Sequence, residues 1–282
     1  MERRPLQMLF APSILLLSFP RVGAEAPFQF KPLLTGKGIP VKKTRTIAIL
    51  LLCLGAPVLP ASEPAKTIEL VGETLDAWRA DTGAWRVVGG VELGRKDTKF
   101  LDAKEGIGVI YNGPERTCDL LSKFEHGDVR VHVEFVVPKG SNSGVYLQGR
   151  YEVQILDSWG VEKPTHGDCG GIYQRWKDGR GFEGHAPKTN ASLRPGEWQT
   201  FDILFRAPRF DENGDKKENA RFLRVIHNGR LIHEDVEVTG PTRAARFEDE
   251  QPLGPLMLQG DHGPVAYRNI TITPLDLSKI AD

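Results

Sequence analysis

Cysteine is scarce in this chain, and neither sign of charge is in excess. The 282 residues include three cysteines and no Cys-x-x-Cys pair, so the usual ligand spacing of a structural zinc site is missing. Lysine plus arginine and aspartate plus glutamate each number 37, which gives a formal net charge of zero. Without a basic excess or a basic stripe, the electrostatic basis for binding nucleic acid is also missing. These absences argue against a zinc module and against a nucleic-acid-binding protein.

The few cysteines also limit disulfide formation. Cys53 lies in an apolar segment that we expect to leave with a leader, and Cys118 and Cys169 remain. In an oxidising compartment these two could form one disulfide, and the alternative is two free, packed thiols. Hydrophobic residues make up 40% of the chain and charged residues 26%, so a sizeable core can form without a disulfide scaffold.

Long hydrophobic runs are lacking as well. Apolar stretches span about residues 9–19 and 47–59, and the second is too short and too interrupted by proline and glycine to predict a membrane span. Basic residues precede this stretch and small residues follow it, which is typical of a secretory signal. We therefore predict a leader over residues 1–61, cleavage near Ala61, and export to the periplasm or the extracellular space with no stable membrane span in the mature chain.

The leader contains two candidate starts. Val41 opens the second apolar segment as an alternative start codon would, so residues 1–40 could be an over-extended gene start. The alternative is a genuine N-terminal extension whose own signal ends near residues 24–26. N-terminal sequencing of the mature protein distinguishes them, because the second interpretation predicts a chain that begins near Ala26.

From about Thr67 onward the pattern is that of β-strands. Apolar residues alternate with polar ones over residues 129–135, which indicates a strand with one buried face. Asn228-Gly229 separates two apolar runs and is typical of a hairpin with a type I′ turn. No long segment has a period of 3.6, and 30 glycines and 20 prolines suit many short strands joined by turns. The sequence therefore predicts an all-β sandwich or barrel.

Two long loops interrupt the strand pattern, at about residues 158–195 and 210–220. The second begins like a calcium loop, but Lys216 stands where such a loop needs glycine, so a solvated hairpin tip is the preferred interpretation. In the first, His166, Asp168 and His185 could complete a site for a divalent metal ion, although their spacing fits no known ligand pattern.

The densest group of polar residues is in segment 151–157. On a regular strand Glu152 and Gln154 share one face, while Val153 and Ile155 face the core. A carboxyl and an amide on one face predict a cleft, and the alternative is an ordinary exposed polar face. Asp157 has the opposite parity, so it could join them only through a bulge or at the strand end.

Two further clusters carry groups suited to binding sugars or moving protons. Tyr146, Gln148 and Arg150 alternate onto one face, and sugars are bound by aromatic faces together with amide, carboxylate and guanidinium groups. The alternative for Tyr146 is rim packing. A tight glycine-flanked loop presents Asp261 beside His262, a pair that fits a general base, and its alternative is a turn with a structural Asx hydrogen bond.

Together these motifs resemble the 3-keto-disaccharide hydrolase domain, also named the 3-keto-glucoside-1,2-lyase/3-keto-2-hydroxy-glucal hydratase domain. The resemblance runs in the order of the family from about residue 67 to 275, leaving 276–282 as a C-terminal tail. Its landmarks are Trp78, Trp85 and segments 127–129, 142–146, 151–157, 171–173, 196–198, 228–229, 258–263 and 268–270. It implies a concanavalin A-like jelly-roll β-sandwich of two curved antiparallel sheets. It also implies a carbohydrate substrate already oxidised at C3, which a separate oxidoreductase would supply.

The resemblance also implies roles for the clustered residues. His262, paired with Asp261, is the candidate base, and Glu152 is the candidate acid or second base. The candidates for substrate binding are Asn142, Tyr146, Gln148, Arg150, Gln154, Asp157, Tyr173 and Arg268. Arg268 could equally be a buried partner of Glu152 or Asp157.

Three other functions stay open at this point. Family 16 glycoside hydrolases share the fold and carry Glu-x-Asp-x-x-Glu, where this chain reads Glu152, Gln154, Asp157. Because a retaining mechanism needs two close carboxylates, the central amide argues against an ordinary secreted glycosidase. A non-catalytic carbohydrate-binding module would depend on Tyr146, Trp159 and Trp176, since fold does not fix function. The last alternative is a structural envelope protein.

Overall fold

The computed structural model describes residues 66–277, which lie in the second of the two units into which the chain divides, Pro60–Asp282. The leader, Cys53 and the end of the tail lie outside the described residues. Every named element within them is a β-strand. The strands are β1 Ile68–Glu69, β2 Arg86–Leu93, β3 Leu101–Tyr111, β4 Leu120–His126, β5 Val129–Val136, β6 Asn142–Leu147, β7 Tyr151–Leu156, β8 Arg175–Lys177, β9 Arg180–Phe182, β10 Gln199–Arg206, β11 Arg209–Phe210, β12 Lys216–Glu218, β13 Ala220–His227, β14 Arg230–Val238, β15 Gly254–Leu258 and β16 Ala266–Pro274.

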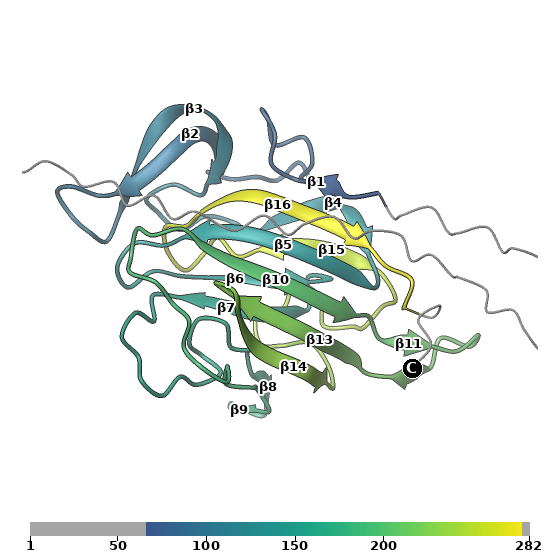
Figure 1. Cartoon of the computed structure of the whole chain (residues 1–282). Helices are drawn as coiled ribbons and strands as arrows, with labels where there is room; N and C mark the ends of the chain where they lie inside the picture. The colour runs from purple at the N-terminus through teal and green to yellow at the C-terminus, as the bar shows by residue number, and fades with distance from the viewer. Residues whose placement is uncertain (1–65, 278–282) are drawn as a thin grey trace, which may run out of the picture. The chain divides into compact units, whose positions relative to one another are not determined.

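Two antiparallel sheets make up the body of this unit. The larger has the order β14-β13-β10-β5-β16-β3-β2, with β1 pairing on β16. The smaller has the order β4-β15-β6-β7. Figure 1 shows β16, β5, β10 and β13 in front of β15, β6 and β7, so the two sheets lie face to face. The predicted all-β jelly-roll sandwich is confirmed.

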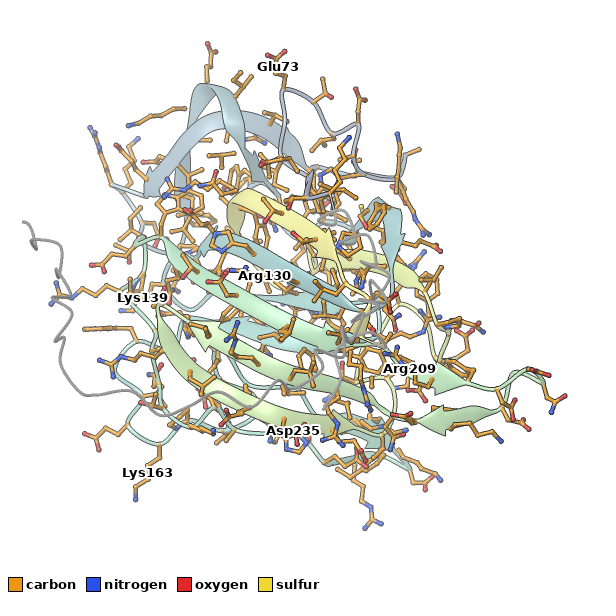
Figure 2. The ribbon with its side chains drawn as sticks, turned by 45° about the vertical axis from the view of Figure 1, so that its right-hand side comes forward. Glu73, Arg130, Lys139, Lys163, Arg209 and Asp235 are labelled. Atoms are coloured by element: carbon orange, nitrogen blue, oxygen red, sulfur yellow. The ribbon has the colours of Figure 1, made fainter. Side chains whose placement is uncertain are left out.

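The core lies between the two sheets and follows the alternation in the sequence. On β5, Val131, Val133 and Phe135 are fully buried, whereas Arg130 is exposed and projects from the outer face in Figure 2. These residues belong to one hydrophobic cluster that also takes Val153 from the smaller sheet. Alternate residues on facing strands therefore close the sandwich, as the period of two requires.

The hairpin at residues 228–229 also follows from the local sequence. Asn228 and Gly229 connect β13 to β14 and have φ angles of 49° and 77°. Positive φ at both central residues defines a type I′ turn, which asparagine and glycine tolerate best. The predicted turn is confirmed.

The smaller sheet is covered on both faces, unlike an ordinary sandwich face exposed to solvent. Glu152 and Gln154 are only 2% and 4% exposed. The long loop runs along the edge of β7, where Gly170 N donates to Gln154 O at 2.8 Å and Tyr173 N donates to Glu152 O at 3.1 Å. Segment 170–173, which borders β7, forms only isolated bridges, through Ile172. An ordinary exposed polar face is therefore the wrong interpretation for Glu152 and Gln154.

The structure also shows the state of the two remaining cysteines and the conformation of the charged loop. Cys118 and Cys169 are free thiols, and burial raises the pKa of Cys169 to about 12, so the two are not bonded to each other. Segment 210–220 forms the β11–β12 hairpin, and Asp211 in its turn pairs with Lys217 at 2.6 Å. Over residues 66–277 the fold contains no helix that is long and apolar enough to cross a membrane.

Candidate active site

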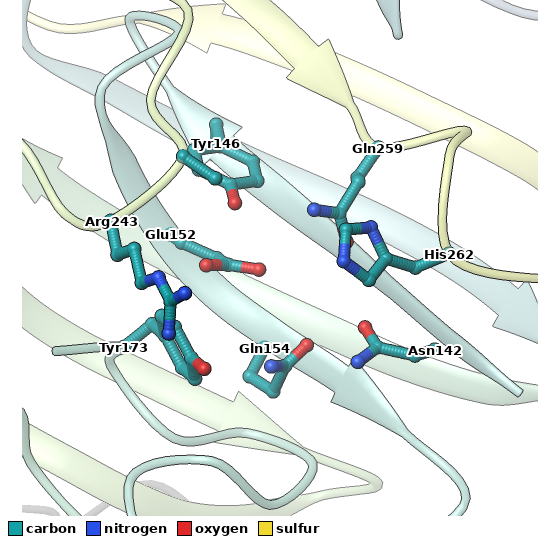
Figure 3. Close-up of a pocket in the computed structure, with 9 residues that line it drawn as sticks. Asn142, Tyr146, Glu152, Gln154, Tyr173, Arg243, Gln259 and His262 are labelled. Carbon is teal, nitrogen blue, oxygen red and sulfur yellow. The ribbon is translucent and has the colours of Figure 1, made fainter. Parts of the chain in front are cut away.

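A polar pocket of about 300 Å³ opens on the outer side of the smaller sheet. Figure 3 shows Glu152 inside it, with Arg243 and His262 on opposite sides. The lining residues are Asn142, Tyr146, Glu152, Gln154, Tyr173, Arg243, Ala244, Gln259 and His262. The structure thus brings together six residues that the sequence analysis proposed for the site, from four separate segments.

Strand register explains why these side chains meet. Tyr146 on β6 lies directly opposite Glu152 on β7, and Gly144 lies opposite Gln154. Directly opposed residues of an antiparallel pair point to the same face. On the other side of β6, Met257 pairs with Tyr146, and Gln259 N donates to Gly144 O at 2.9 Å. Three neighbouring strands therefore present their alternate residues to one pocket.

Glu152 is the buried acid of this pocket. Burial raises the pKa of its carboxyl to about 8, a shift that the Tyr146 hydroxyl opposes and that the charges of Asp119 and Asp261 increase. At neutral pH the carboxyl is therefore mostly protonated and can donate a proton. A carboxylic acid held neutral in this way is typical of a general acid.

Three buried polar atoms point to a ligand. Asn142 Oδ1 and Gln154 Oε1 have no hydrogen-bond partner among the described residues. Tyr146 Oη has none of hydrogen-bond geometry either, although it lies close enough to Glu152 to oppose the rise of that pKa. Leaving such atoms unpaired costs about 1–3 kcal/mol each. Burial also raises the pKa of Tyr146 well above its usual value, so its hydroxyl stays a donor. All three line the pocket, where hydroxyl or carbonyl groups of a substrate could pair with them.

The imidazole of His262 lies on the opposite wall from Arg243. Its Nδ1 is hydrogen-bonded to Asp261 Oδ1, which leaves Nε2 as the nitrogen free to exchange a proton. The loop that carries this pair is held by Asn112, whose Nδ2 donates to Gly263 O at 2.7 Å and to Gly260 O at 3.2 Å. Asn112 is fully buried, so it fixes the position of the loop from within the sandwich.

Gln148 and Arg150, which the sequence analysis proposed for substrate binding, lie outside the pocket because the chain turns between β6 and β7. Gln148 has a φ of 54° and donates from Nε2 to His126 O and Pro252 O. Arg150 binds Asp249 and the carbonyl of Gln148. The period-two argument that placed both with Tyr146 fails here, since the strand ends at Leu147.

Asp157 and Arg268 also lie elsewhere. Asp157 accepts hydrogen bonds from Gly140 N at 2.9 Å and Trp159 N at 3.4 Å, so it caps turns at the end of β7. Arg268 lies on the larger sheet, where its Nε donates to Glu134 at 2.6 Å. Its partner is therefore neither Glu152 nor Asp157.

Sequence reasoning missed three lining residues, Gln259, Arg243 and Ala244. Gln259 could have been found by extending the register of β15 by one residue. Arg243 and Ala244 lie in an irregular segment without a strand pattern, and Ala244 has a φ of 62°. This segment is held against β7 by Thr242, whose Oγ1 donates to Arg150 O and accepts from Glu152 N.

Two of the three residues considered for a metal ion, Asp168 and His166, make other contacts. Asp168 accepts hydrogen bonds from Thr165 N and Ser158 Oγ, and His166 packs edge-on against Tyr173. Within the part of the chain that the structure describes, no group of three or more His, Cys, Asp or Glu side chains is arranged to hold a metal ion. The geometry gives no support to a metal site at His166, Asp168 and His185.

Gly144 offers a test of how closely the Glu152 carboxyl is positioned. A Cβ at residue 144 would lie 2.3 Å from Glu152 Oε1 and 2.9 Å from the Tyr146 ring. Because the carboxyl is the end of a flexible side chain, we expect Gly144→Ala to displace it and to lower kcat by ~10²-fold while the protein still folds. Kinetics and thermal unfolding of the purified variant measure both.

The matched control for this substitution is Gly90→Ala. Gly90 also lies on a strand, and an added Cβ there would meet no atom within 4 Å. This variant should keep the activity and the Tm of the wild type. Wild-type kcat in Gly144→Ala would show that the Glu152 carboxyl need not occupy its present position.

One family model and several solved structures are similar to this chain. The model of the 3-keto-alpha-glucoside-1,2-lyase-like domain matches residues 66–273. A presumed glycosyl hydrolase from Parabacteroides distasonis ATCC 8503, known from its crystal structure, is 29% identical, with a TM-score of 0.55 over 78% of this chain and 93% of its own. A second presumed glycosyl hydrolase from that organism is 21% identical, with a TM-score of 0.47 over 74% and 100% of the two chains. No curated protein sequence matches. Since the family match spans almost the whole sandwich, the chain belongs to the family of 3-keto-alpha-glucoside-1,2-lyase-like domains.

Proposed function

We propose that this protein is an exported enzyme that cleaves 3-keto-glycosides by removing the C2 proton and eliminating the aglycone from C1. Addition of water to the resulting glucal would complete a net hydrolysis. The observation that carries the proposal is the pairing, within one polar pocket, of a buried neutral carboxyl with an aspartate-oriented imidazole. The leader predicted from the sequence supports export.

The proton transfers in this reaction can be assigned to these two groups. A ketone at C3 acidifies the proton on C2, and we assign the removal of that proton to His262 Nε2, with Asp261 holding Nδ1. The electron pair of the C2–H bond moves into the C2–C3 bond as the C3 carbonyl becomes an enolate. When the enolate collapses, this pair forms the C1–C2 double bond as the C1–O bond breaks. Glu152, which is protonated at neutral pH, gives its proton to the departing oxygen, and the aglycone leaves as a neutral alcohol.

The enolate formed on the way needs hydrogen-bond donors at the former keto oxygen. Tyr146 Oη is buried, stays protonated and has no partner in the described part of the chain. Arg243 adds a guanidinium at the pocket wall, with up to five N–H donors. Donors placed where charge develops are a major source of rate enhancement, and we assign them this role.

Hydration would use the same groups in reverse. The Glu152 carboxylate left by the elimination would take a proton from water while the water oxygen adds to C1. The imidazolium of His262 would return its proton to C2. Both side chains then regain their starting states, so one pocket could carry out elimination and hydration in sequence.

The lining of the pocket argues against an ordinary retaining glycosidase. Glu152 is the one carboxyl among its lining residues, and Asp157 is engaged with backbone amides at the strand end. A retaining double displacement needs two carboxyl groups about 5 Å apart across the scissile bond. A carboxyl paired with an imidazole fits proton abstraction better.

Turnover of a 3-keto-glucoside beside its unoxidised parent tests the proposal. We expect aglycone release from the keto sugar alone, because only the ketone makes the C2 proton acidic. Release from the parent would instead establish an ordinary glycosidase. Sugar binding without turnover of either would favour a carbohydrate-binding module, and a parallel assay with chelator would decide whether a divalent metal ion is required.

A further inference from the structure

A second hollow adjoins the active-site pocket and shares part of its wall. It has a volume of about 420 Å³, and Arg243 and Ala244 line both cavities. Its other lining residues are Arg175, Trp176, Pro241, Thr242, Ala245 and Glu248. A molecule could therefore pass from one hollow to the other over a single arginine.

Trp176 forms the main apolar surface of this second hollow. It lies in the β8–β9 hairpin and is 45% exposed. The hairpin is held in place, because Arg175 Nη1 donates to Thr239 Oγ1 and Arg243 N donates to Gln174 O. An exposed indole on a fixed hairpin beside a polar pocket is typical of a surface that a ligand covers.

Arg243 joins the two hollows. Its guanidinium carbon lies 3.9 Å from the centre of the Trp176 ring, so the indole holds the side chain by a cation–π contact. Among residues 66–277 its guanidinium forms no hydrogen bond and no ion pair with another side chain. Its N–H donors are thus available to a ligand that spans the two cavities.

The size of the first pocket is consistent with such a second site. Its volume of about 300 Å³ is at the lower limit of small-molecule pockets and suits one sugar ring. A glycoside has two parts joined through one oxygen, so the part that leaves must lie outside this pocket. The second hollow adjoins the first pocket at Arg243, so it offers space for this part of the substrate.

We infer that the hollow formed by Trp176, Arg243 and Glu248 is the subsite for the leaving group of the substrate. It takes a six-membered ring with an apolar face, which packs on Trp176 while Arg243 and Glu248 bind its polar substituents. A second sugar ring and an aromatic aglycone share this chemistry. The inference rests on the proposed function, because it assigns the part of the substrate that the proposed elimination releases.

Trp176→Ala tests the subsite with three substrates, the 3-keto-glucosides of methanol, of a phenol and of a second glucose. For a substrate whose ring leaves through the subsite, we expect KM to rise by about tenfold. For the methyl glycoside KM should stay unchanged, because methanol is too small to reach the indole. Loss of the contact between Trp176 and Arg243 should change kcat to the same extent for all three substrates. Trp176→Phe should restore most of the affinity, since it keeps an aromatic face.

Trp159→Ala is the matched control. Trp159 is 51% exposed and also lies under an arginine, with Arg194 at 5.3 Å, but it lines neither hollow. This variant should match the wild type with all three substrates. A rise in KM for the phenyl glycoside alone would identify an aromatic aglycone, and a rise for the disaccharide alone would identify a sugar.

Other outcomes would overturn the inference. If Trp176→Ala raises KM equally for all three substrates, or for none of them, the hollow is not a leaving-group subsite even though the enzyme turns over. If the wild type releases no leaving group from any of the three, the proposed function itself fails, and the subsite fails with it.

Discussion

Glu152→Gln should abolish most of the activity and leave the protein at least as stable as the wild type at alkaline pH. The amide keeps the size and the hydrogen-bonding capacity of the carboxyl but has no proton to give to the leaving oxygen. Loss of a general acid lowers kcat by ~10²- to 10⁴-fold. In the wild type kcat should fall as the pH rises through about 8, because the acid must be protonated. The residual kcat of the variant should not show this fall.

The stability change follows from the direction of the pKa shift. The pKa of Glu152 is about 8 in the folded protein and 4.5 in the unfolded chain. The contribution of this group to stability is therefore complete below pH 4.5 and is lost as the pH rises through 8. Glutamine does not ionise, so the difference in Tm between the variant and the wild type should grow in favour of the variant from pH 5 to pH 9. A variant that keeps wild-type kcat would end the assignment of Glu152 as the acid.

The parts of the site that could be predicted from the sequence are those governed by strand geometry. Alternation placed Glu152 and Gln154 together, and the pairing of β6 with β7 adds Tyr146 because directly opposed residues share a face. The same rule, applied to the pairing of β15 with β6, places Gln259 on this face as well. Which face a residue occupies depends only on its own strand and the neighbouring strand, so the sequence pattern can predict it.

The rule fails where the strand ends. Gln148 adopts a left-handed conformation, so Arg150 beyond it no longer follows the parity of Tyr146. The one residue near this point with an evident preference for a turn is Gly149. It follows Gln148, so the sequence does not indicate that β6 already ends at Leu147.

The sequence named Trp176 only under the alternative of a carbohydrate-binding module and did not name Arg243. That both lie beside the pocket could not be predicted, for a different reason. Their place beside the pocket depends on contacts between segments far apart in the chain, such as Arg243 N with Gln174 O and Thr242 with the backbone of Glu152. An irregular segment carries no periodicity, so its position follows only from the folded structure. Residues that line a pocket from such segments are thus the ones that sequence patterns omit.

His262→Ala should lower kcat by ~10²- to 10⁴-fold as well, but at a different step from Glu152→Gln. The imidazole is exposed on a loop that Asn112 holds, so its removal should leave the fold and the Tm unchanged. Asp261→Asn keeps the imidazole but weakens its orientation, and we expect a smaller loss. Full activity in His262→Ala would exclude this residue as the base.

Exchange of the C2 proton with deuterium from solvent separates the two steps. Proton removal by His262 precedes departure of the leaving group, which needs the proton of Glu152. In D₂O, Glu152→Gln should therefore still incorporate deuterium at C2 of the unreacted 3-keto-glucoside, because enolate that cannot eliminate returns to substrate. His262→Ala should incorporate it no faster than the uncatalysed control. If instead Glu152→Gln loses exchange and His262→Ala keeps it, the two roles are reversed, and Glu152 is the base that the sequence left open as an alternative.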